Sequence, residues 1–216
     1  MLHSPGARNG GGVVKEGPKR FDRDYFDRWY RDPRHRVATP ADVRRRVLLA
    51  TGVAEMVLGR RVRSVLDVGC GEASWRAPLV RLRPGVRYEG VDASEYAVRR
   101  YGRSRGIRLG SVGELDRAGL RGKFDIVICA DVLHFLSERE VERGLYQVHH
   151  LLEGVAYLPT FTSADEVEGD VGALHSRSPK WYLARFAAAG LVPLGLDFYA
   201  DRSIARSLSA LELPCA

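Results

Sequence analysis

The chain has 216 residues, 45% of them hydrophobic, a length typical of a single domain with a buried core. Its three cysteines, Cys70, Cys129 and Cys215, are widely spaced, which argues against a disulfide framework or a cysteine-based metal site. No apolar run approaches the length that spans a bilayer, and the N-terminus lacks the apolar core of a signal peptide. We therefore expect a cytoplasmic protein with no membrane partner.

The net charge of +7 is unevenly distributed along the chain. Residues 1–108 carry 24 basic and 12 acidic side chains, whereas residues 109–216 carry 10 basic and 15 acidic ones. A basic half is a feature of nucleic acid-binding proteins. Arginine outnumbers lysine 30 to 4, however, and the arginines are scattered without interleaved aromatic residues. Compositional bias therefore explains them better than a nucleic acid partner does.

The N-terminal part contains two segments of different character. Residues 1–20 are rich in glycine and proline and are predicted to be a disordered tail, with a single domain over residues 21–216. Residues 21–31 place aromatic side chains at helical spacing, which predicts a short helix whose aromatic face covers the core. A longer helix is predicted from Pro40 to Gly59, with Thr39 as its N-cap.

A glycine-rich turn follows the first predicted strand, residues 62–68. Gly69 and Gly71 permit a tight turn and let backbone N–H groups approach a bound molecule. No third glycine follows at the spacing of a dinucleotide fingerprint, which argues against nicotinamide and flavin dinucleotides. Asp92 ends the second strand, 21 residues after Gly71 (92 − 71), where a carboxylate accepts ribose hydroxyls.

The remaining elements alternate between strands and helices. Strands are predicted at residues 86–92, 107–110, 124–130, 155–160 and 191–199, and helices after Ser74, at residues 94–104, from Ser137 and at residues 180–189. The tail after Asp201 has mixed spacing that suits an edge strand or a helix, and we favour the helix. Residues 161–178 form a long irregular stretch above the sheet edge, and we expect a flap there.

Three stretches together resemble a known family. They are Asp67-Val68-Gly69-Cys70-Gly71, then Glu89-Gly90-Val91-Asp92, then Phe124-Asp125-Ile126-Val127-Ile128-Cys129. They are similar to motifs one, two and four of the class I S-adenosylmethionine-dependent methyltransferases, and the resemblance spans roughly residues 40–200. It implies an α/β fold, with a Rossmann-like, doubly wound, mostly parallel sheet and helices on both faces.

The resemblance also implies roles for individual residues in binding S-adenosylmethionine and its product S-adenosylhomocysteine. Asp67 would anchor the methionine ammonium, and Asp92 would hold the ribose. The full set of expected cofactor-binding residues is Asp67, Gly69, Cys70, Gly71, Asp92, Ala93, Ser111, Val112, Cys129 and Ala130. Many family members have an acidic residue where this chain has Gly110-Ser111-Val112, so Ser111 and Val112 are assigned weakly.

The acceptor side is expected at the loop after residues 124–130 and at the flap. Asp131 and His134 are candidate catalytic residues, with His134 as the first choice of base, although many methyltransferases need none. If residues 21–31 form a lid, as in related enzymes, then Tyr25, Trp29 or Tyr30 would contact ligand. In the flap, Phe161 and His175 are the candidate acceptor contacts.

Motifs that are absent narrow the acceptor. The chain has no Asn/Asp-Pro-Pro-Tyr/Phe motif of base-amine methyltransferases, no Pro-Cys nucleophile of cytosine-C5 enzymes and no Asp-Asn pair of the metal-dependent catechol type, so no metal is predicted. The sequence therefore predicts a methyltransferase acting on nitrogen or oxygen of a small molecule. An RNA or protein acceptor, or a domain that binds the cofactor without catalysis, stays as an alternative, and the oligomeric state is not predicted.

Overall fold

The computed structural model describes residues 20–167, 170 and 172–208. Residues 1–19, which make up nearly all of the predicted disordered tail, lie outside the described residues. Within the described ranges, no helix combines the length and the apolar character needed to cross a membrane.

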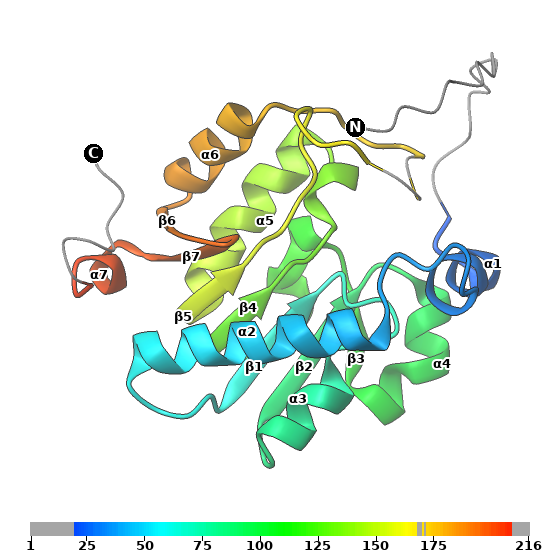
Figure 1. The fold of residues 1–216 in the computed structure, drawn as a ribbon, viewed down its shortest axis with the longest axis horizontal. Coiled ribbons are helices and arrows are strands. Elements are labelled where there is room, and N and C mark those ends of the chain that lie inside the picture. The colour runs from blue at the N-terminus through cyan, green and yellow to red at the C-terminus, as the bar shows by residue number, and fades with distance from the viewer. Residues whose placement is uncertain (1–19, 168–169, 171, 209–216) are drawn as a thin grey trace, which may run out of the picture.

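A seven-stranded sheet forms the centre of the molecule, in the order β3-β2-β1-β4-β5-β7-β6 (Figure 1). Its strands are β1 (Ser64–Val68), β2 (Arg87–Asp92), β3 (Ile107–Leu109), β4 (Phe124–Ile128), β5 (Leu152–Tyr157), β6 (Leu191–Gly195) and β7 (Phe198–Asp201). The first five strands pair in parallel, and β7 is antiparallel to both of its neighbours. The predicted Rossmann-like, mostly parallel sheet is therefore confirmed.

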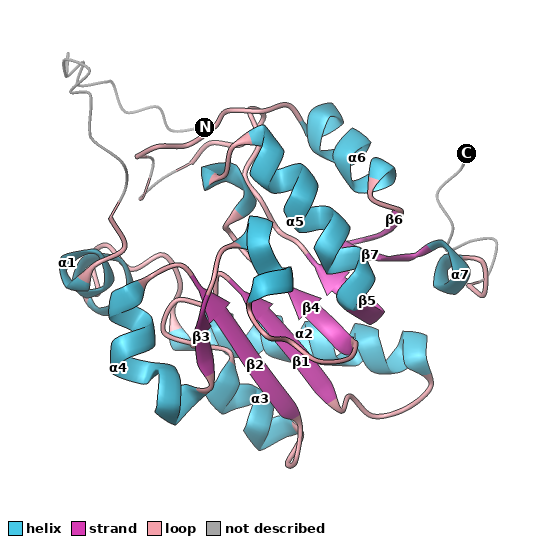
Figure 2. Ribbon diagram, turned by 180° about the vertical axis from the view of Figure 1, so that it is seen from behind, coloured by secondary structure: helices cyan, strands magenta, loops and turns pink. Residues whose placement is uncertain are grey.

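Helices cover both faces of the sheet. The α-helices are α1 (Arg23–Phe26), α2 (Pro40–Leu58), α3 (Arg76–Leu82), α4 (Glu95–Arg105), α5 (Glu138–Leu151), α6 (Pro179–Ala188) and α7 (Arg202–Ala205). Short 3-10 or π-helical turns occur at η1 (Asp27–Arg31), η2 (Val112–Arg117) and η3 (Leu133–Phe135). One face packs against α2 and α3, and the other against α5 and α6 (Figures 1 and 2).

The elements form where local sequence and burial agree. Every residue of β1 and of β4 is buried, as expected for central strands covered on both faces. Thr39 and Asp42 form a reciprocal capping box at the start of α2, and Gly59 ends that helix in the left-handed conformation. These signals fix the helix that lies under the carboxyl edge of β4 and β5.

Two predicted strands have different bounds in the structure. Residues 191–199 were expected to be one strand, and this prediction is wrong because the chain turns back between β6 and β7. Gly195, Leu196 and Asp197 all have positive φ values, of 100°, 51° and 63°. Both strands of this hairpin carry apolar residues, so the hydrophobic run conceals the turn. β5 starts three residues earlier than predicted, directly at the end of α5.

Candidate active site

One carboxylate, that of Asp92, joins the glycine turn after β1 to the start of α4. Gly69 and Gly71 adopt φ values of 69° and 53°, a conformation in which glycine has no steric penalty. The Gly71 amide donates to Asp92 Oδ2 at 2.6 Å, and the Ser94 amide donates to Asp92 Oδ1 at 2.8 Å. Asp92 is buried, with 8% of its surface exposed. It therefore fixes the glycine turn against the N-terminus of α4, at the tip of β2 where the sequence predicts it.

Asp67 is the most deeply buried acid of the predicted set. Its carboxylate accepts a hydrogen bond from the Tyr88 hydroxyl at 2.7 Å, and 3% of its surface is exposed. Burial raises the pKa of Asp67 to about 7, and burial also raises the pKa of Asp92. Two neighbouring carboxylates thus lie in a poorly solvated region, where a bound cation or hydroxyl donor would be favoured.

The N-terminal aromatic segment, residues 21–31, covers this region. Phe26 is buried and stacks on Tyr96, with 5.7 Å between the ring centroids. Arg31 forms an ion pair with Glu72, the residue after the glycine turn. The Ser94 hydroxyl donates to the Phe21 carbonyl at 2.5 Å. The segment is thus attached to the same loop and helix start that Asp92 joins.

Tyr30 enters the site from this segment. A β-carbon built on Gly71 would collide with the Tyr30 hydroxyl, so the phenol lies directly on the glycine turn. Burial raises the pKa of Tyr30, with further contributions from Tyr25, Asp92, Cys70 and Asp67. No hydrogen bond is made by this hydroxyl within the described residues, which leaves it available to a ligand.

Tyr25 and Trp29, the other two predicted lid residues, have different partners. The Tyr25 hydroxyl donates to Asp170 of the flap at 2.9 Å, so the N-terminal segment and the flap meet above the site. The Trp29 ring contacts Arg28 in the same segment and His35, which follows the segment. The structure therefore brings Tyr25 and Tyr30 to the site and places Trp29 at its outer side.

The loop after β4 directs its polar residues in two directions. Asp131, at φ 59°, accepts from Arg46 of α2 at 2.6 Å. His134 is 2% exposed, and its Nδ1 accepts from the Phe161 amide at 3.3 Å. The two predicted catalytic side chains therefore contact different walls, α2 for Asp131 and the flap for His134.

Three predicted acceptor residues share one cavity of about 160 Å³. His134, Phe161 and His175 all line it, together with Asp165 and other flap residues. The rings of His134 and Phe161 lie 5.0 Å apart, and the His175 amide donates to the His134 carbonyl at 2.8 Å. This cavity is the part of the candidate acceptor region that the flap encloses.

The remaining predicted cofactor residues contribute mainly backbone or packing. Cys129 and Val112 are buried in the core on the α5 side, and Cys70 packs beside Gly90. Ala130 packs on the α2 side, Ala93 is exposed in the bend before α4, and Ser111 precedes η2 without a side-chain cap.

Three residues at the end of β5 were missed by sequence reasoning. They are Arg46, Tyr157 and Asp197, which come from α2, β5 and the β6–β7 turn. Tyr157 interacts electrostatically with both of the others. Nothing local marks them, because Arg46 lies in a run of three arginines and Tyr157 in an apolar strand. Their proximity depends on the sheet order.

One family model matches part of the chain. Residues 66–154 match the family model described as a methyltransferase domain. This range starts in β1 and ends in β5, so it contains the glycine turn, Asp92 and the loop after β4. No curated protein matches the sequence at a significant level.

Solved structures resemble the fold over much of the chain. The sugar N-methyltransferase KedS8 from Streptoalloteichus sp has a TM-score of 0.58 at 20% identity, over 94% of this chain and 96% of that one. The plantazolicin methyltransferase BamL, solved with SAH, has a TM-score of 0.56 at 15% identity, over 70% of this chain. The [4+2]-cyclase SpnF has a TM-score of 0.51 at 21% identity, over 72% of this chain. The chain spans 65% of BamL and 59% of SpnF. At these identities the similarity establishes the fold.

Proposed function

We propose that this protein, whose residues 66–154 match the methyltransferase-domain family model, transfers the methyl group of S-adenosylmethionine to a nitrogen or oxygen of a small-molecule acceptor. The sugar N-methyltransferase KedS8 and the plantazolicin methyltransferase BamL, which was solved with SAH, support this class of reaction. The cyclase SpnF shares the fold, so the proposal depends on the site.

The observation that carries the proposal is the convergence on the glycine turn of Asp67, Asp92 and the Tyr30 hydroxyl, which makes no hydrogen bond to any described residue. S-adenosylmethionine supplies a methyl carbon already activated by positively charged sulfur. The protein therefore has to bind the cofactor, orient the acceptor and exclude water. Asp67 is a buried carboxylate without a cationic partner among the described residues, and the amino acid ammonium would provide one. The positive-φ glycines leave room for backbone contact with the ligand.

Asp92 retains the capacity to hold a ribose. Each of its oxygens accepts one backbone amide, from Gly71 and Ser94. A carboxylate oxygen has a second lone pair, so two ribose hydroxyls can donate to the same group. Asp92 would then link the ligand, the glycine turn and the start of α4.

On the acceptor side, the role proposed for His134 is positioning. Its Nδ1 accepts the Phe161 amide, so in the neutral ring the proton is on Nε2. Neither ring nitrogen then has a free lone pair with which to take a proton from the acceptor. This arrangement supports hydrogen bonding by His134 more than proton removal.

Calorimetric titration of S-adenosylmethionine and S-adenosylhomocysteine tests the cofactor site. We expect micromolar affinity, equivalent to about 8 kcal/mol. Replacing Tyr30→Phe should weaken binding about fivefold through the loss of one hydrogen bond, whereas the matched control Tyr146→Phe, at an exposed residue of α5, should not. Folded wild-type protein that bound neither ligand would refute the proposal. Acceptor-dependent formation of S-adenosylhomocysteine then distinguishes an enzyme from a domain that only binds S-adenosylmethionine.

A further inference from the structure

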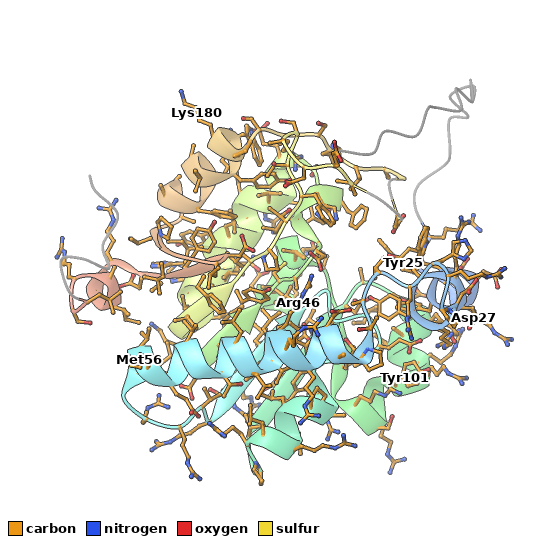
Figure 3. All side chains as sticks on the ribbon, viewed as in Figure 1. Tyr25, Asp27, Arg46, Met56, Tyr101 and Lys180 are labelled. Atoms are coloured by element: carbon orange, nitrogen blue, oxygen red, sulfur yellow. The ribbon has the colours of Figure 1, made fainter. Side chains whose placement is uncertain are left out.

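A second cavity, of about 200 Å³, lies at the edge of the sheet opposite the proposed active site. It is lined by residues 61–63, which lead into β1, and by residues 83–86, which lead into β2. These segments precede their strands, whereas the glycine turn follows β1, and the five residues of β1 separate the two edges by about 16 Å. Figure 3 labels Met56 in the last turn of α2, which leads to this cavity, and Tyr25 at the other side of the molecule. The cavity is therefore distinct from the site proposed for the methyl donor.

Hydrogen bonds hold the two walls of this cavity in place. The Arg87 amide donates to the Arg63 carbonyl at 2.8 Å, which joins the start of β2 to the start of β1. The Arg63 amide donates to Asp125 Oδ2 at 2.6 Å, and the Val62 amide donates to Glu55 Oε1 at 2.9 Å. The wall before β1 is thus attached to β2, β4 and α2. The shape of the cavity is therefore set by the fold itself.

Two arginines on the wall before β1 keep their guanidinium groups free. Burial alternates along this wall as it does in a strand, because Val62 is 4% exposed and its neighbours Arg61 and Arg63 are exposed. The two arginine side chains therefore lie on the same, outer side of the segment. Neither side chain forms an ion pair or a hydrogen bond to any residue that the structure describes. All of their N–H donors are thus available to a ligand.

Arg83, on the wall before β2, is held in a fixed position. Two of its nitrogens donate to the two oxygens of Glu55, both at 2.5 Å, and the third donates to a backbone carbonyl at 2.8 Å. A guanidinium has five N–H donors, so two of them remain. Glu55 also interacts electrostatically with Arg61, and the adjacent pair of Arg60 and Asp125 is neutral. The three arginines that line the cavity and the carboxylate of Glu55 therefore leave a net charge of +2.

The charge and the lining of the cavity favour a phosphate group. A phosphate monoester carries about two negative charges near pH 7 and three acceptor oxygens, which match a net charge of +2 and donors on both walls. A carboxylate has one charge and two oxygens, so it gains less. No other described atom lies within 4 Å of the position that a β-carbon would take at Gly85, so the cavity is open there. Val62, Pro84 and Val86 add apolar surface beside the charge.

We propose that this cavity is a second ligand site, in which Arg61, Arg63 and Arg83 bind the phosphate group of a small molecule. The phosphate oxygens accept hydrogen bonds from the two free guanidinium groups and from the remaining donors of Arg83. This inference is independent of the methyltransferase function proposed above, because the cavity shares no residue with the glycine turn or the flap. The phosphate group belongs either to free inorganic phosphate or to an organic ester, and the probes below distinguish these two sources.

Titration of three small anions, followed by NMR of the backbone amides, tests the site. Phenyl phosphate, inorganic phosphate and benzoate are added separately to the full chain at constant ionic strength and near pH 8, where phosphate is dianionic because its second pKa is about 6. We expect both phosphates to shift the amide signals of residues 61–63, 85 and 86, and to bind about tenfold more tightly than benzoate. Tighter binding of phenyl phosphate than of inorganic phosphate identifies an organic ester as the ligand, and equal affinities identify free phosphate.

Variants that each remove one positive charge locate the site. Arg61→Gln and Arg63→Gln should each weaken phosphate binding about tenfold. Arg99→Gln, which removes the same charge from an exposed residue of α4, should leave the affinity nearly unchanged. All three substitutions are at exposed positions, and an unchanged midpoint of urea unfolding verifies that each variant is folded.

Three results would overturn the inference. They are phosphate binding no tighter than benzoate binding, amide shifts that lie away from the cavity, and equal weakening by Arg99→Gln and by the two cavity variants. None of these titrations requires S-adenosylmethionine or S-adenosylhomocysteine. A failure of the phosphate site is therefore distinguishable from a failure of the proposed function.

Discussion

The contact between Tyr30 and Gly71 allows a direct test of how the N-terminal segment closes the site. Replacing Gly71→Ala adds a β-carbon at φ 53°, where the left-handed conformation costs about 1–2 kcal/mol for a residue with a side chain. The same β-carbon collides with the Tyr30 hydroxyl, and overpacking of this kind costs about 1–3 kcal/mol. We therefore expect Gly71→Ala to lower the free energy of unfolding by roughly 3 kcal/mol.

A double-mutant cycle separates the backbone cost of a side chain at positive φ from the cost of the collision with Tyr30. Tyr30→Phe removes the colliding oxygen, and the next ring atom would lie 3.0 Å from the new β-carbon. In that background the cost of Gly71→Ala should fall toward the backbone term of about 1–2 kcal/mol, with a small remainder from the tight contacts to the Tyr30 ring and to Phe26, at 3.2 Å. Urea unfolding of the wild type, both single variants and the double variant measures the coupling.

Hydrogen exchange of residues 21–31 provides a second readout. We expect faster exchange in Gly71→Ala and recovery in the double variant, because the displaced segment opens locally. An equal cost of Gly71→Ala in both backgrounds, with unchanged exchange in the segment, would show that Tyr30 does not lie on the glycine turn.

Three further predictions follow from buried and capping groups. Burial raises the pKa of Asp67 to about 7, so the native state keeps a proton that the unfolded chain releases near pH 4. The contribution of this group to the free energy of unfolding is therefore complete below pH 4 and falls by up to about 4 kcal/mol as the pH rises to 7. Urea unfolding as a function of pH measures this fall, which should be absent in Asp67→Asn. The buried carboxylate of Asp125 pairs with both terminal nitrogens of Arg60, at 2.9 and 2.8 Å, and accepts a hydrogen bond from the Arg63 amide at 2.6 Å. Asp125→Ala should therefore lower the free energy of unfolding in urea by about 3–5 kcal/mol. A loss below about 1 kcal/mol would contradict this account. Ser137 forms a capping box with Glu140 at the start of α5, so Ser137→Ala should lower the midpoint of thermal unfolding through a loss of about 1 kcal/mol, whereas Ser104→Ala, inside α4, should have a smaller effect.

The sequence predicts the central elements of the fold well, because their signals are local. β1 and β4 are mostly apolar and buried, and the helices at Pro40 and Ser137 begin with capping residues that act within one turn. The β6–β7 hairpin was missed because its turn, Gly195 to Asp197, lies inside an apolar stretch. Hydrophobic periodicity does not distinguish one long strand from two short ones when both are largely apolar.

The candidate site also contains residues that local sequence signals reveal and residues that only tertiary contacts bring together. Asp67, Gly71 and Asp92 are found from the sequence because each follows or ends a strand at a fixed spacing. Tyr30 appears in the sequence as one of several aromatic residues, and the contact that distinguishes it from Trp29 is tertiary. Tyr157 and Asp197 meet because β7 pairs with β5, which depends on the sheet order.

The position of β7 has a consequence for the order in which the protein is made. β7 pairs with β5, yet 40 residues, 158–197, separate the two strands in the chain. On the ribosome, β5 therefore emerges with one edge unpaired, and this edge stays open to other chains until residues 198–201 have left the exit tunnel. Asp197 directly precedes β7, so the nascent chain can form the glycine turn well before it can bring Asp197 to the end of β5.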